Sequence, residues 1–86
     1  HIGRIHVKCC LQDDVRMFAI DFTDVRILRQ AIINKFALAS KKFQVKYKDE
    51  MGEMVVLCDD DDLMRAVRGR FLRIVIHPLY DTTLSQ

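Results

Sequence analysis

The chain has 86 residues, of which 50% are hydrophobic and 30% are charged, and its formal net charge is +2 at pH 7. This balance is typical of one small folded domain, and it excludes both a disordered tail and a chain with room for an additional catalytic domain. No apolar run reaches the about 20 residues that a membrane-spanning helix needs, and residues 1–4 do not form a signal peptide.

The first element expected is a β-hairpin. Residues 4–11 alternate between two faces, of which one is apolar and carries Ile5, Val7 and Cys9. The polar cluster at 12–14 then predicts a turn. Residues 16–22 continue at period two, with Arg16 near the start of the strand and three side chains directed inward: Phe18, Ile20 and Phe22. We expect this second strand to end at Asp21 or Phe22.

A long amphipathic helix is expected next. Thr23 is a plausible N-cap, and Asp24 suits the positive end of a helix. Apolar residues then recur at helical spacing, at Val25, Leu28, Ile32 and Phe36. The pattern predicts a helix that runs to about Leu38.

The second half of the chain repeats the order of hairpin and helix. Phe43, Val45 and Tyr47 alternate with polar residues, and residues 54–57 form a second apolar run, so two strands are expected around an acidic loop. Aspartates at 59–62 lead into a short helix that Gly69 stops. Residues 71–77 predict a last strand with Leu72, Ile74 and Ile76 on one face, stopped by Pro78.

The resulting order is ββαββαβ, which predicts an α+β roll with one mixed sheet packed on a helix. The ubiquitin-like β-grasp is the familiar fold of this kind. We expect one domain over residues 1–86, with a structured core over about 4–78 and a flexible tail over 79–86.

The cysteines and the first residue indicate the cellular setting. The three cysteines are odd in number and make no disulfide framework, so we interpret Cys9, Cys10 and Cys58 as free thiols in a reducing compartment. Cys58 precedes four aspartates, which disfavour its thiolate, so we expect it to pack. Because the sequence starts with His1, we expect a part of a larger cytoplasmic protein, or of a nuclear one if the parent regulates transcription.

The two signs of charge are segregated along the chain. Residues 1–48 carry +6 and residues 63–86 carry +3, whereas residues 49–62 hold seven carboxylates, no Lys or Arg, and a charge of −7. Segregated charge favours docking onto a partner, or onto another copy, in one orientation. Interaction is therefore the leading class of function.

Residues 47–63 also carry a specific spacing of acidic residues. Asp49, Gly52, Glu53 and Asp62 match a pattern of Asp, any residue, Asp or Glu, Gly, Asp or Glu, then eight residues and a carboxylate. This run strongly resembles the acidic motif of the PB1 (Phox and Bem1) domain, although Met51 stands where the second acidic residue is usual. The order of elements matches this family over nearly the whole chain. The resemblance implies an acidic partner-binding face formed by Asp49, Glu50, Glu53, Asp60, Asp61 and Asp62.

The resemblance implies a basic face as well. Lys8 lies on the first predicted strand, where basic-faced members of the family carry their key lysine, and Arg16 is expected beside it on the second strand. A domain with both faces is similar to the dual-faced (type I/II) variety. Carboxylates on one copy can accept charge-assisted hydrogen bonds from cations on the next, so the contact is heterologous and leaves both ends of a pair open.

The function implied is that of a non-catalytic module that joins head to tail with PB1 domains, its own copies or those of other proteins, within a larger signalling or scaffold protein. No cofactor, metal, nucleic acid, membrane or small-molecule substrate is expected. If position 51 faces a partner's cation, Met51→Asp is expected to tighten binding to a basic-faced PB1 domain.

Other interpretations stay open beside this one. The acidic run can be a solvated loop and helix cap, Lys8 can be an ordinary exposed residue, and Arg16 can pair with Asp13 or Asp14. A calcium-binding EF-hand fails because Met54 stands where glycine is required. The basic stretches 41–46 and 65–73 would gain little from nucleic-acid phosphates beside so much negative charge. The rival functions are a ubiquitin-like domain that binds a small GTPase and an enzyme, for which no catalytic constellation is found.

Overall fold

A computed structural model of the chain describes residues 3–21 and 23–79. Within these residues, strands and helices follow in the predicted order ββαββαβ. The strands are β1 (Ile5–Leu11), β2 (Asp14–Ile20), β3 (Phe43–Lys48), β4 (Met54–Val56) and β5 (Phe71–Pro78). The helices are α1 (Val25–Phe36) and α2 (Asp60–Ala66).

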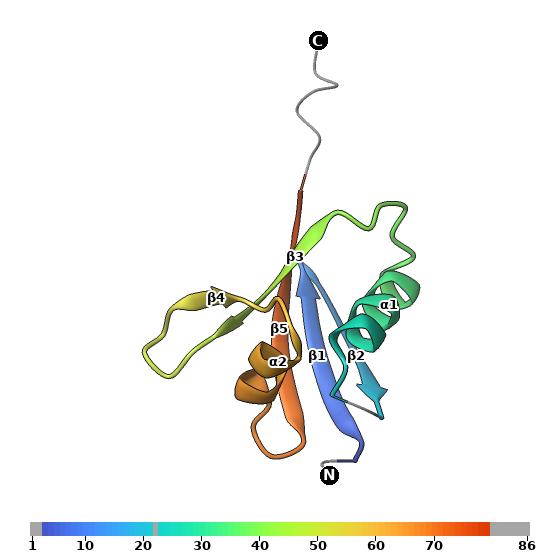
Figure 1. Ribbon diagram of the computed structural model, residues 1–86. Helices are drawn as coiled ribbons and strands as arrows, with labels where there is room; N and C mark the ends of the chain where they lie inside the picture. Colours follow the sequence, from blue (N-terminus) through green and yellow to red (C-terminus); the bar gives the residue numbers. More distant parts are fainter. Residues whose placement is uncertain (1–2, 22, 80–86) are drawn as a thin grey trace.

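The strands form one mixed sheet in the order β2-β1-β5-β3-β4. β1 pairs with β5 in parallel, whereas the β1–β2, β3–β5 and β3–β4 pairs are antiparallel. α1 crosses the sheet over β1 and β2, and α2 lies beside the first half of β5 (Figure 1). The chain therefore has the predicted α+β fold of the ubiquitin-like β-grasp kind.

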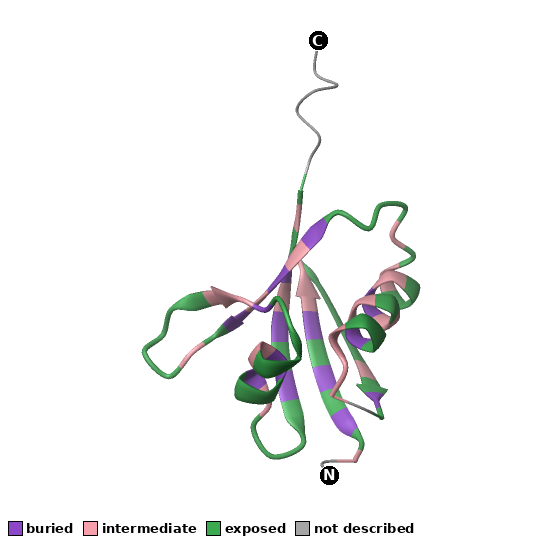
Figure 2. Ribbon diagram, in the orientation of Figure 1, coloured by how far each residue is buried: buried purple, intermediate pink, exposed green. Residues whose placement is uncertain are grey.

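The core lies between the sheet and the helices. Buried and exposed residues alternate along β1 and β5, as the colours of Figure 2 show. The alternation predicted from the sequence is confirmed, since the fully or almost fully buried side chains include Ile5, Val7 and Cys9 of β1 and Leu72, Ile74 and Ile76 of β5. α1 and α2 cover them with Leu28, Ile32 and Leu63, each of which is 0% exposed. Every second residue of these strands consequently lies on an open face that the helices do not cover.

α1 begins and ends one or two residues inside the predicted limits. Asp24, rather than Thr23, is the N-cap, and its side chain accepts a hydrogen bond from Arg26 N at 2.8 Å. The helix ends at Phe36 because Ala37 adopts the left-handed conformation, with φ 53°. Leu38 N then donates to the carbonyl of Ile33 at 3.0 Å, which closes the last turn.

Further expectations concern the end of β5, the packing of Cys58, and the residues at 22 and 79–86. β5 ends at Pro78 as expected, although the proline itself is the last residue of the strand, where a missing N–H costs no interior ladder bond. Cys58 is exposed, so the prediction that it packs is wrong. Phe22 and most of the expected tail, residues 80–86, lie outside the described residues. Within the described ranges, no helix is long and apolar enough to span a bilayer.

The left-handed residue after α1 leads to the first prediction. A Cβ at positive φ destabilises the folded state by about 1–2 kcal/mol. Glycine removes this cost, but its greater conformational freedom in the unfolded chain cancels part of the gain. Ala37→Gly should therefore raise the free energy of unfolding by about 0.5–1 kcal/mol, measured by urea denaturation. The matched variant Ala31→Gly, inside α1, should lower it by about 1 kcal/mol or more. Equal effects of the two substitutions would contradict the assigned conformation.

The buried thiol of Cys9 leads to a second prediction. Burial, with the neighbouring Cys10 thiol, raises the pKa of Cys9 from 9.0 to about 12. Because the unfolded chain ionises this thiol at lower pH than the folded domain, its contribution to stability is complete below pH 9. That contribution is lost as the pH rises from about 9 to about 12. Cys9→Val should flatten the alkaline fall in unfolding free energy, and an unchanged pH profile would refute the shift.

Candidate functional site

The loop between β3 and β4 is a turn organised by Asp49. Asp49 Oδ1 accepts hydrogen bonds from the backbone N–H groups of Met51 and Glu53, both at 2.9 Å. Asp49 N donates to the carbonyl of Glu53 at 2.8 Å, and Gly52 takes the positive φ of 84° that the turn requires. The half-buried Asp49 thus holds the turn, and the residues at its tip, Glu50, Met51 and Glu53, are exposed.

The second part of the acidic segment caps α2. Asp59 is the N-cap and accepts a hydrogen bond from Asp62 N at 2.9 Å. Asp62 reciprocates, because its Oδ2 accepts from Cys58 N at 2.8 Å, and its Oδ1 lies 3.0 Å from the guanidinium of Arg65. This reciprocal arrangement is a variant of the capping box, in which the second carboxylate accepts from the residue before the N-cap rather than from the N-cap itself. The side chain of Asp62 is only 19% exposed, so most of its surface faces its own domain.

Asp60 links the two helices. Its Oδ1 accepts a hydrogen bond from Val25 N at 2.8 Å, which satisfies one of the free N–H groups at the start of α1. Asp24 satisfies the next one, and hydrogen bonds from the Arg26 side chain and backbone hold the pKa of Asp24 below its usual value. The beginnings of α1 and α2 are therefore joined through one carboxylate.

The seven carboxylates of the acidic segment consequently divide into two groups. Four accept hydrogen bonds from backbone N–H groups of this domain: Asp49, Asp59, Asp60 and Asp62. In the described part of the chain, the other three make no hydrogen bond or ion pair, and all are exposed: Glu50, Glu53 and Asp61. We call these three the free carboxylates. They are the groups with most freedom to bind an external cation.

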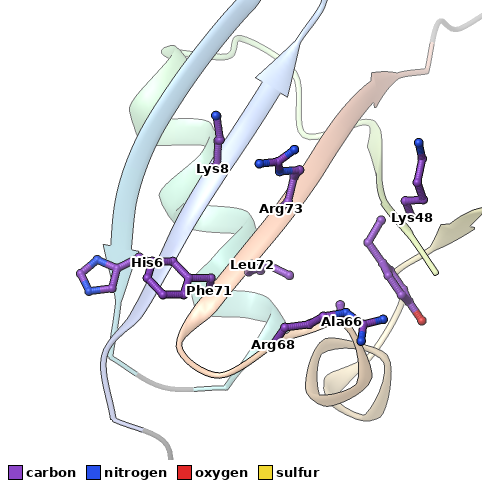
Figure 3. Close-up of a pocket in the computed structure, with 9 residues that line it drawn as sticks. His6, Lys8, Lys48, Ala66, Arg68, Phe71, Leu72 and Arg73 are labelled. Atoms are coloured by element: carbon purple, nitrogen blue, oxygen red, sulfur yellow. The ribbon is translucent and has the colours of Figure 1, made fainter. Parts of the chain in front are cut away.

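Lys8 lies on the open face of the sheet, away from the helices. In the parallel β1–β5 register its neighbour is Arg73, and in the antiparallel β1–β2 register its neighbour is Met17. Figure 3 shows Lys8 and Arg73 side by side on adjacent strands, with α1 behind them. Both cations are exposed, and neither has an ion pair with any residue that the structure describes.

Arg73 was missed by the sequence reasoning. Arg73 lies between the inward-facing Leu72 and Ile74, so the alternation along this strand already marks it as outward-facing in the sequence. Its place beside Lys8 follows only from the parallel pairing of two strands that lie at opposite ends of the chain.

Arg16 is not beside Lys8, which corrects the expected placement. Arg16 pairs in register with Cys9, whose side chain is buried in the core, whereas Lys8 pairs with Met17. Because successive side chains of a strand point to opposite faces, Arg16 lies on the helix side of the sheet.

The guanidinium of Arg16 has partners within the domain. It lies 3.0 Å from Asp14 Oδ2, as the alternative interpretation predicted, and it donates to the carbonyl of Lys35 at 2.7 Å. It also lies 5.1 Å from the centroid of the Phe36 ring. Arg16 thus holds the end of α1 against β2, and its role in partner binding stays a prediction.

A pocket of about 310 Å³ extends the cationic area next to Lys8 and Arg73. It exists because β3 pairs with β5 only between Val75 and Pro78, so Tyr47 and Lys48 diverge from the first half of β5. Phe71 and Leu72 are among the apolar residues that line it, and its cations are Lys8, Lys48, Arg68 and Arg73 (Figure 3). We call these four residues the basic surface.

The described residues were also compared with the donor sets that hold metal ions. Among residues 3–21 and 23–79, no group of three or more His, Cys, Asp or Glu side chains is arranged to hold a metal ion. The ring of His6 instead lies 5.7 Å from that of Phe71.

Comparison with known proteins agrees with this architecture. A solved structure described as "AtNBR1-PB1 domain" has a similar fold, with a TM-score of 0.74, 24% sequence identity, and coverage of 90% of this chain and 99% of that chain. A second, described as "Cryo-EM structure of AtNBR1-PB1 filament (L-type)", has a TM-score of 0.71, 26% identity and the same coverage. The sequence profile of the PB1 domain family matches residues 4–79. The chain therefore belongs to the PB1 domain family, whose members are protein-interaction modules.

Proposed function

We propose that this domain is a non-catalytic module of the dual-faced PB1 variety, which joins head to tail with other PB1 domains. Copies of this chain are one class of partner, and PB1 domains of other proteins are another. The acidic surface of one domain, built on residues 49–62, binds the basic surface of the next. The parent protein is proposed to be a larger signalling or scaffold protein.

The observation that carries this proposal is the placement of opposite charge on different elements. The free carboxylates lie on the β3–β4 loop and α2, whereas Lys8 and Arg73 lie on the open face of β1 and β5. Neither set is neutralised by partners in the described residues. Two unlike surfaces on one rigid domain make a heterologous contact, which extends into a chain unless its rotation closes a ring. One of the similar structures is of a PB1 filament, and this supports the proposal that such domains assemble into chains.

The carboxylates of the acidic surface differ in how much the fold depends on them. Asp60 and Asp62 belong to the implied acidic face, but both also accept hydrogen bonds from the backbone of this domain. Their hydrogen bonds to Val25 N and Cys58 N mean that alanine at either position should cost about 0.5–2 kcal/mol of stability. Glu50 and Glu53 are the better probes, because their side chains have no partner in the described part of the domain.

Assembly should depend on ionic strength. The electrostatic screening length falls from about 10 Å at 0.1 M salt to about 3 Å at 1 M salt, which weakens exposed ion pairs. Light scattering should detect assemblies at low salt that dissociate towards the monomer mass at high salt. A domain that stays monomeric at every salt and protein concentration would exclude self-assembly.

The two surfaces should be separable by mutation. Lys8→Ala should block binding to an acidic partner, and Glu50→Ala with Glu53→Ala should block binding to a basic partner, each with a loss of about 2–5 kcal/mol if the charges are buried in the contact. Each variant alone should be monomeric, whereas their mixture should form a dimer through the two intact surfaces. Analytical ultracentrifugation would measure these masses. The controls are Lys41→Ala and Asp13→Ala, each of which removes one charge of the corresponding sign from an exposed position outside both surfaces.

A further inference from the structure

Each of the two charged surfaces has an exposed apolar side chain at its centre or edge. Met51 is 85% exposed at the tip of the β3–β4 loop, between Glu50 and Glu53. Met17 is 60% exposed on the open face of β2, where it is the direct register partner of Lys8. Isolated exposed apolar residues are common on proteins. The informative feature here is that both methionines lie where an oppositely charged surface is proposed to dock.

The two sides carry complementary groups, because each combines an apolar side chain with charges of one sign. Met17, Lys8 and Arg73 form a row across β2, β1 and β5, with about 4.8 Å between neighbouring strands. The row therefore presents one apolar group followed by two cations. The loop presents an apolar group between carboxylates, because the Asp49 hydrogen bonds fold residues 49–53 into one turn. Met51 adjoins Glu50 in the chain, and Met17 adjoins Lys8 in the register of the sheet. A contact of Glu50 with Lys8 therefore brings the two methionines close to each other.

We propose that, in the head-to-tail contact of two copies, Met51 of one copy packs against Met17 of the next. This inference rests on the proposed function and adds a residue pair that selects the partner. Methionine is flexible and polarisable, and it is enriched in protein interfaces. The pair favours a second copy of this chain, because a carboxylate at position 51 or a cation at position 17 would be buried against a thioether instead of its counter-ion.

Phe71 is another exposed apolar residue near Lys8, at 66% exposure. It lies in the next row of the sheet, opposite His6, and its ring already lies 5.7 Å from the His6 ring. Met17 is the apolar neighbour in the row of Lys8 itself. It is therefore the residue to which the loop is assigned.

A double-mutant cycle in a one-to-one dimer tests the pair. One partner carries Lys8→Ala, which leaves only its acidic surface open, and receives the changes at Met51. The other carries Glu50→Ala with Glu53→Ala, which leaves only its basic surface open, and receives the changes at Met17. Met17→Ala and Met51→Ala should each weaken association about tenfold by titration calorimetry, and together they should weaken it no more than either alone.

Charged substitutions form a second test, because the acidic motif and the methionine pair predict opposite effects of Met51→Asp on binding. Met51→Asp, which the acidic motif alone predicts to tighten binding, should weaken it when position 17 is methionine. Adding Met17→Arg to the opposite partner should recover the lost affinity by supplying a counter-ion. Ile27→Ala and Leu79→Ala are the controls, since these residues are 39% and 47% exposed and lie outside both charged surfaces. Circular dichroism would verify that all variants are folded.

The outcomes separate this inference from the function on which it rests. The pair is refuted, and the head-to-tail contact stands, if the two partners associate but the methionine truncations do not weaken their binding. The same conclusion follows if the losses of binding free energy of the two single truncations simply add in the double variant. Tighter binding by Met51→Asp alone would also refute the pair. If the partners do not associate at all, both the proposed contact and the pair are overturned.

Discussion

The parallel pairing of β1 with β5 is the constraint on which the rest of the structure depends. It places two strands from opposite ends of the chain at the centre of the sheet, with Cys9 beside Ile74 on the buried side. The same register places Lys8 beside Arg73 on the open side. Core packing and charge placement are therefore two consequences of one backbone alignment. A slip of one residue would exchange them, burying cations and exposing the apolar row.

The acidic segment combines a structural role with the proposed recognition of a partner within a few residues. Asp49, Asp59 and Asp62 satisfy backbone N–H groups at a turn and a helix start, and Asp60 joins the two helices. These bonds fix the backbone from which Glu50, Glu53 and Asp61 project. Because a bound carboxylate oxygen retains further lone pairs, the capping residues add negative potential to the same surface. Pre-organisation of this kind lowers the entropy that a partner loses on docking.

Much of the fold follows from local patterns, whereas the site depends on long-range geometry. Period-two alternation predicted the buried side of β1, and helical spacing predicted that Leu28 and Ile32 face the core. The end of α1 was not predictable in this way, since Leu38 continues the apolar pattern while Ala37 turns the backbone out of the helix. The role of Asp60 depends on an N–H group 35 residues away. Alternation already places Arg16 on the side of Phe18 and Ile20 and Lys8 on the opposite side of the sheet. The hairpin register, in which Arg16 pairs with Cys9, agrees with this separation.

The shared use of residues 59–62 also affects how this sequence can change during evolution. A lineage that lost its binding partner would be free to replace Glu50, Glu53 and Asp61, whereas selection for a folded domain would continue to retain the carboxylates that cap α2 and anchor α1. Asp49 and Asp62, the hydrogen-bonded carboxylates of the acidic motif, would therefore persist after the interaction was lost. In descendants of this domain, substitution of the three free carboxylates, rather than of the hydrogen-bonded ones, would mark the loss of the partner.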